Sequence, residues 1–109
     1  MSKKNKEGFE TRAIHAGQKA DPTTGAVMMP IYTSSTYEQE SPGVHKGFDY
    51  SRSINPTRKA FEECIASLEN GEVGFGFSSG VAAISACVEL LSPGDLSLIH
   101  ISEPTRRYA

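Results

Sequence analysis

The sequence predicts an α/β fold, because its second half reads as helix, strand and helix in that order. Residues 73–77 alternate apolar side chains with glycine, which is typical of a short buried strand. The apolar residues that follow recur at helical spacing, at Val81, Ile84, Val88 and Leu91. An earlier helix is marked at its start by Asn55-Pro56 and at its end by Asn70-Gly71.

The earlier helix has a clear starting signal and a predicted buried face. Asn55 is expected as its N-cap, with Pro56 at the first helical position. Its apolar face is expected to bury Phe61, Cys64, Ile65 and Leu68.

Tyr50 and Arg52 precede this helix, on a segment that we expect to be extended and able to reach away from its own domain. An arginine guanidinium forks onto phosphate oxygens, and a tyrosine hydroxyl adds one more hydrogen bond. The pair therefore suggests a phosphate contact. An exposed tyrosine and a solvated arginine with no ligand would explain the same residues.

The turn Ser78-Ser79-Gly80 lies between the predicted strand and the second helix. Ser79 is a good N-cap, and a helix N-terminus offers unpaired N–H groups and a partial positive charge to an anion. Gly74 and Gly76 leave room for close backbone approach. A plain connection is the alternative, because the turn lacks the glycine spacing of a P-loop or a dinucleotide fingerprint.

Residues from about Thr11 to Asp95 resemble the N-terminal part of the pyridoxal-phosphate enzymes of cysteine and methionine metabolism. That family includes cystathionine gamma-synthase, cystathionine beta- and gamma-lyases, and methionine gamma-lyase. The resemblance follows ordered segments: 11–17, 25–27, 30–31, 34–37, 41–49, the signature Tyr50–Arg58, Ser79-Gly80 and 92–95. It implies the aminotransferase-like α/β fold (fold type I), of which this chain would supply an N-terminal arm, the first strand and helices, truncated.

The resemblance also implies roles for four residues. Tyr50 and Arg52 would bind the phosphate of pyridoxal 5'-phosphate in the neighbouring subunit's active site. The N–H groups of Gly80 and Val81 would bind the phosphate of their own subunit's cofactor. The parent would be a homotetramer with active sites shared between subunits. Ile54 stands where the family usually has glycine, which would strain the chain if that position needs a positive φ.

The implied chemistry is elimination or replacement at the γ-carbon of sulfur amino acids or activated homoserine, by a lyase or a transferase. Substrates would be cystathionine, activated homoserine and cysteine. Segment 41–52 looks most like cystathionine gamma-synthase and gamma-lyase. Methionine gamma-lyase and O-acetylhomoserine sulfhydrylase are alternatives within the family, and a non-catalytic phosphate-binding or interaction fragment is the alternative outside it.

No catalytic residue is predicted in this chain. The family's Schiff-base lysine has no counterpart among the lysines before Asp95, which are Lys3, Lys4, Lys6, Lys19, Lys46 and Lys59. We therefore expect the chain as given to be inactive.

Four segments are expected. Residues 1–8 read as a solvated tail, 9–49 as an extended arm, and 50–95 as the start of the pyridoxal-phosphate domain. Residues 96–106, LSLIHISEPTR, match the in-frame translation of a transposase sequencing adapter, so we expect 96–109 to be an artefact that ends a truncated sequence. A real strand is the alternative reading of this apolar segment.

Composition excludes several other classes. The net charge of −2 gives no electrostatic footprint for nucleic acid or an anionic membrane. No apolar run is long enough to span a bilayer, and the N-terminus lacks a signal-peptide core. Cys64 and Cys87 are expected to be buried thiols in a reducing cytoplasm. The three histidines share no ligand spacing, so no metal site is expected.

Overall fold

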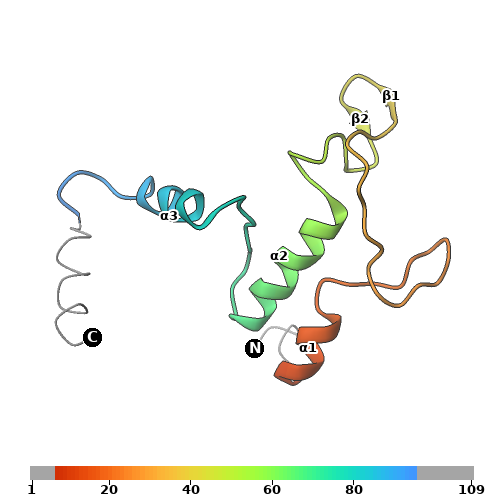
Figure 1. The fold of residues 1–109 in the computed structure, drawn as a ribbon, viewed down its shortest axis with the longest axis horizontal. Helices are drawn as coiled ribbons and strands as arrows, with labels where there is room; N and C mark the ends of the chain where they lie inside the picture. Colours follow the sequence, from red (N-terminus) through yellow and green to blue (C-terminus); the bar gives the residue numbers. More distant parts are fainter. Residues whose placement is uncertain (1–6, 96–109) are drawn as a thin grey trace. The chain divides into compact units, whose positions relative to one another are not determined.

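The computed structural model describes residues 7–95, which fall into two compact units that divide after Gly76. The first unit contains helix α1 (Phe9–His15), strands β1 (Gln39–Ser41) and β2 (Val44–His45), and helix α2 (Pro56–Leu68). The second contains helix α3 (Gly80–Val88). Figure 1 shows these elements along the chain.

Helix α2 begins and ends where the sequence predicts. The Asn55 side chain accepts hydrogen bonds from Thr57 N at 2.8 Å and from Arg58 N at 3.3 Å, and Pro56 occupies the first turn. After the helix, Asn70 adopts a left-handed φ of 55°, and Gly71 N donates to Ala66 O at 2.8 Å. Capping at both ends thus follows local sequence rules.

Helices α1 and α2 pack closely because small residues lie between them. Ala60 and Ala66, which are 7% and 8% exposed, are the buried apolar residues of the described range. Gly17 follows α1 with a φ of 77°, and a Cβ added there would lie 2.5 Å from Ala60 O. Cys64 Sγ lies 3.7 Å from the carbonyl oxygen of Arg12, a weak donor contact. Arg12 Nη1 also donates to Ser67 O, so side-chain donors that bond to backbone carbonyls join α1 to α2.

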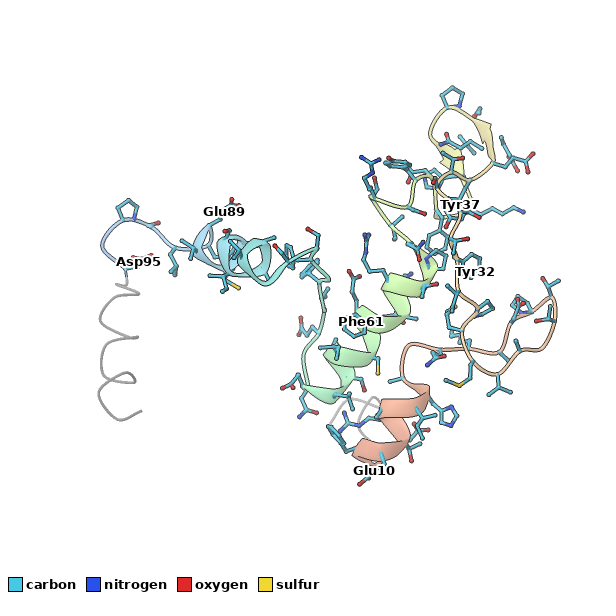
Figure 2. All side chains as sticks on the ribbon, viewed as in Figure 1. Glu10, Tyr32, Tyr37, Phe61, Glu89 and Asp95 are labelled. Atoms are coloured by element: carbon cyan, nitrogen blue, oxygen red, sulfur yellow. The ribbon has the colours of Figure 1, made fainter. Side chains whose placement is uncertain are left out.

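The expectation that α2 buries its large apolar residues is wrong for Phe61 and Ile65. Phe61, labelled in Figure 2, is 60% exposed and Ile65 is 41% exposed, while Cys64 and Leu68 are half-buried. The physical reason is the small size of α1. It covers the alanine side of α2, and within residues 7–76 no other layer covers Phe61.

Residues 73–77, predicted as a strand, form none. A strand needs a partner for its backbone ladder, and no described segment pairs with these residues. Phe75 is accordingly 76% exposed. The expected close backbone approach is confirmed, because a Cβ on Gly74 would lie 2.4 Å from Glu62 O and Gly76 N donates to Glu62 Oε1 at 2.8 Å.

The segment 9–49 is not extended throughout. It opens with α1, which has Glu10 in its first turn and Arg12 and His15 in its last, as the helix dipole favours. Farther on, β1 and β2 form an antiparallel hairpin in which Gln39 pairs with His45. Gly43 sits in the connecting turn with a φ of 82°. The segment thus contains a short helix and a short hairpin, which its composition did not reveal.

Helix α3 is confirmed, with Ser79 as its N-cap. The Ser79 side chain accepts from Ala82 N at 3.1 Å. Leu91, predicted as its last apolar position, lies beyond the helix. Residues 1–6 and the adapter-like segment 96–109 lie outside the described residues. In the range 7–95, none of the helices has the length and apolarity needed to cross a bilayer.

Candidate phosphate-binding site

Tyr50 and Arg52 lie on a turn, not on the extended segment that the sequence predicts. Ser53 N and Ile54 N both donate to Tyr50 O at 3.0 Å. These bonds fold residues 50–54 back on themselves just before α2. The turn therefore holds Tyr50 and Arg52 close to the start of their own helix.

Backbone pairing with residues 34–37 fixes the start of this turn. Thr36 and Tyr50 form an antiparallel bridge. On either side of it, Tyr37 N donates to Asp49 O at 3.2 Å and Ser51 N donates to Ser35 O at 2.8 Å. Tyr50 is half-buried as a result, and its backbone is held on both sides.

Arg52 stacks on Tyr50 and keeps its donors available. The Arg52 Cζ lies 5.4 Å from the centre of the Tyr50 ring, within cation–π range. The guanidinium makes no hydrogen bond or ion pair with any residue between 7 and 95, and Arg52 is exposed. A stacked guanidinium presents its N–H edge outward, which is the geometry that binds a phosphate through two parallel hydrogen bonds. The structure thus brings this predicted pair together.

Asn55 and Thr57 hold the turn against the preceding chain, a role that the sequence analysis missed. Asn55 Nδ2 donates to Tyr32 O at 3.0 Å and to Ser51 Oγ at 3.3 Å. Thr57 Oγ1 donates to Pro30 O at 3.2 Å and accepts from Tyr32 N at 2.9 Å. Polar side chains in the first helical turn can bond outward as well as cap, and that was the available signal.

The second pair of predicted donors, Gly80 and Val81, lies in the first turn of α3. Their N–H groups have no intrahelical partner by helix geometry, and no other described residue bonds to them. A Cβ at Gly80 would meet nothing within 4 Å, so the space before the helix is open. Ser79 already caps Ala82 N, which leaves these two donors for a ligand.

The chemistry of both donor pairs fits a phosphate group. One pair offers a guanidinium and a phenol, and the other offers two backbone N–H groups at a helix N-terminus. The pairs belong to different units of the structure. Ile54 does not have a positive φ, so it causes no strain of that kind before α2. Among the described non-glycine residues, the positive φ is found at Asn70.

Of the other titratable groups, Asp49 adjoins the turn, where its Oδ1 accepts a hydrogen bond from Tyr50 N at 2.8 Å. The pKa of Asp21 is lowered, first by the hydrogen bond from Thr24 Oγ1 at 2.8 Å and next by that from Thr23 N at 3.2 Å. Cys64 is half-buried, but Cys87 is exposed, so the expectation of a buried thiol is wrong for Cys87. Between residues 7 and 95 no three histidine, cysteine or acidic side chains cluster as metal ligands would.

Comparison with known proteins assigns the chain. The family model of the Cys/Met metabolism PLP-dependent enzymes matches residues 10–105. The chain belongs to this family. A cystathionine beta-lyase of Coxiella burnetii is 64% identical over 90 residues, covering 83% of the chain and 23% of the relative. A cystathionine gamma-lyase of Dictyostelium discoideum is 50% identical over 111 residues, covering 99% of the chain and 29% of the relative.

Solved structures confirm the predicted fold class. The crystal structure of metB from Corynebacterium glutamicum has a TM-score of 0.78 at 42% identity, covering 86% of this chain and 25% of that one. Yeast cystathionine gamma-lyase has a TM-score of 0.72 at 42% identity, covering 81% of this chain and 22% of that one. The chain is thus similar to the N-terminal part of an α/β pyridoxal-phosphate domain, and it spans about a quarter of the length of the relatives it matches.

Proposed function

We propose that this chain is the N-terminal region of a pyridoxal-phosphate enzyme that cleaves or forms the thioether of cystathionine. The full-length enzyme, here the chain together with the remainder that its relatives possess, would act at the γ-carbon of sulfur amino acids or activated homoserine. The observation that carries the proposal is the turn 50–54, in which Arg52 stacks on Tyr50 with its guanidinium unpaired. Family membership supports the cofactor.

The residues of this chain would bind and orient the cofactor. Tyr50 and Arg52 would hold its phosphate with two charge-assisted hydrogen bonds and one phenolic hydrogen bond. Gly80 and Val81 would hold phosphate oxygens through their N–H groups. When bound, pyridoxal phosphate supplies an electron sink for reactions at the carbon atoms of an amino acid. The Schiff-base lysine would come from the remainder of the enzyme, so the chain alone would be inactive.

Active sites would be shared between subunits of a homotetramer. In this proposal Tyr50 and Arg52 serve the neighbouring subunit, while Gly80 and Val81 serve their own. A cytoplasmic location is proposed as well, because both Cys64 and Cys87 are free thiols.

The position of bond cleavage separates the candidate reactions. Relatives named beta-lyase, gamma-lyase and gamma-synthase are 64%, 50% and 47% identical to the chain, so a β-elimination is the second candidate. With cystathionine, γ-elimination releases cysteine, 2-oxobutanoate and ammonia, whereas β-elimination releases homocysteine, pyruvate and ammonia. We expect cysteine and 2-oxobutanoate from the full-length enzyme. Pyruvate with homocysteine would show the β-reaction, and methionine consumed in preference to cystathionine would show the alternative lyase.

Mixed oligomers test the sharing of sites. Subunits carrying Arg52→Ala are combined with subunits in which the Schiff-base lysine is replaced. In such a pair one active site carries both defects and the other carries neither, so activity should return. Mixed oligomers that demonstrably form and regain no activity would contradict binding across the subunit boundary.

A further inference from the structure

The guanidinium of Arg58 contacts its surroundings through each of its three nitrogens, in contrast to that of Arg52. Arg58 Nη2 donates to Ser53 O at 2.6 Å, and Nη1 lies 3.4 Å from Arg52 O, a longer and weaker contact. Arg58 Nε pairs with Glu62 Oε1 at 3.4 Å, one turn along α2. One planar guanidinium therefore touches two successive carbonyls of the turn 50–54 and a helical carboxylate.

These contacts hold the turn that presents Arg52. The turn itself closes through bonds from Ser53 N and Ile54 N to Tyr50 O, which leave the carbonyls of Arg52 and Ser53 without a backbone partner. Arg58 satisfies both carbonyls from a rigid fork that is fixed to α2. The backbone that carries Arg52 is thereby attached to α2, in addition to the bridge that joins Tyr50 to Thr36.

Glu62 extends the same network to the chain that leads to α3. Its Oε1 accepts from Gly76 N at 2.8 Å and also forms the ion pair with Arg58, and Gly76 is the last residue of the first unit. Gly74 passes so close to α2 that a Cβ there would lie 2.4 Å from Glu62 O. The pair Arg58–Glu62 thus joins the turn 50–54 to residues 73–76.

We propose that Arg58 is a positioning residue for the cofactor phosphate: it does not bind the phosphate but fixes the turn from which Arg52 does. This rests on the proposed function of Arg52. Each guanidinium nitrogen of Arg58 already contacts Arg52 O, Ser53 O or Glu62, which argues against direct binding, because a phosphate bound by the same fork would compete with these contacts. Glu62 supports Arg58 because their ion pair restricts the orientation of the guanidinium that contacts the turn.

A double-mutant cycle in the full-length enzyme tests the inference. The dissociation constant is measured for pyridoxal phosphate and for pyridoxal, which lacks the phosphate, in Arg58→Gln, Arg52→Ala and the double variant. We expect Arg58→Gln to weaken pyridoxal phosphate binding about three- to tenfold and pyridoxal binding less than about twofold. In the Arg52→Ala background the same substitution should have almost no effect, because Arg58 acts through Arg52.

Matched controls lie on the same helix. Lys59→Gln breaks the neighbouring pair Lys59–Glu63, which spans 4.0 Å, and the cation–π contact of Lys59 with Phe48 at 6.0 Å. Neither interaction involves a residue of the turn 50–54, so the substitution should leave phosphate-dependent binding unchanged. Glu62→Gln should weaken pyridoxal phosphate binding, though less than Arg58→Gln does. Glu63→Gln should leave that binding unchanged. Arg58→Lys keeps the charge but loses the fork, so its effect should be intermediate.

The possible outcomes test the role of Arg58 separately from the role of Arg52. Equal loss of pyridoxal and pyridoxal phosphate binding in Arg58→Gln would show a general structural role and overturn the inference. A full effect of Arg58→Gln in the Arg52→Ala background would do the same, since Arg58 would then act independently. If Arg52→Ala alone leaves the affinity for pyridoxal phosphate unchanged, the proposed role of Arg52 fails, and the inference fails with it.

Discussion

The two donor pairs of the candidate site are built in opposite ways. The turn that carries Tyr50 and Arg52 is held by a dense set of bonds from residues 30–37 and from the first turns of α2. The pair at Gly80 and Val81 needs one cap bond, from Ala82 N to Ser79 Oγ. Side-chain donors have rotamer freedom that the surroundings must restrict, whereas the backbone N–H groups of a helix are aimed by the helix itself. The first pair is therefore the one that distant substitutions should disturb.

The largest effect on the fold is expected from Gly74→Ala. The new Cβ would lie 2.4 Å from Glu62 O, a backbone atom that cannot move aside without distorting α2. We expect a loss of about 1–3 kcal/mol in the free energy of unfolding of the full-length enzyme, measured by chemical denaturation.

Gly80→Ala is the matched control in the other region. A Cβ there meets nothing within 4 Å and the backbone is helical, so the free energy of unfolding should not fall. Equal destabilisation by both substitutions would remove the contrast between the regions.

The next largest effect is expected from the two helix caps. Asn55→Ala removes the cap of α2 together with the bonds to Tyr32 O and Ser51 Oγ, and should cost about 1–2 kcal/mol or more. Ser79→Ala removes one cap bond and should cost about 0.5–1 kcal/mol. Chemical unfolding curves of the two variants measure the difference in their free energies of unfolding. Asn55→Asp serves as a further variant, because it keeps the cap but loses the amide donor. A larger cost for Ser79→Ala than for Asn55→Ala would contradict the account.

Local features of the site were predictable from sequence, and tertiary ones were not. Asn55 and Ser79 could be identified as caps because a cap depends only on residues within one helical turn. Thr57 bonds to the carbonyl of Pro30, far away in the chain, and no local pattern reveals that partner. The failed strand at 73–77 has the same origin, since its alternation is real but a ladder requires a partner that residues 7–95 do not supply.

The burial of Phe61 was mispredicted for a related reason. Helical periodicity identifies which face of α2 is apolar, but not which layer covers it. In the described structure, Ala60 and Ala66 lie in the close contact and Phe61 faces outward.

The smallest expected effect is the pH dependence of the turn at Asp21. Its lowered pKa means that the ionised carboxylate is favoured in the folded chain, chiefly by the hydrogen bond from Thr24. The resulting stabilisation is fully present above the pKa of the unfolded chain, about 3.9, and is lost as the pH falls through the lower folded pKa. An NMR titration should show the pKa of Asp21 rising in Thr24→Val. An unchanged pKa in that variant would show that Thr24 is not the cause.

The central claim is that Arg52 binds the cofactor phosphate, and the affinity of full-length Arg52→Ala for pyridoxal phosphate tests it most directly. A charge-assisted phosphate contact contributes about 1.5–3 kcal/mol, so the dissociation constant should rise about tenfold or more. Tyr50→Phe should raise it less, because the ring that stacks under the guanidinium remains. Affinity for pyridoxal should change little in either variant. An Arg52→Ala enzyme that binds pyridoxal phosphate as tightly as the parent would contradict the account.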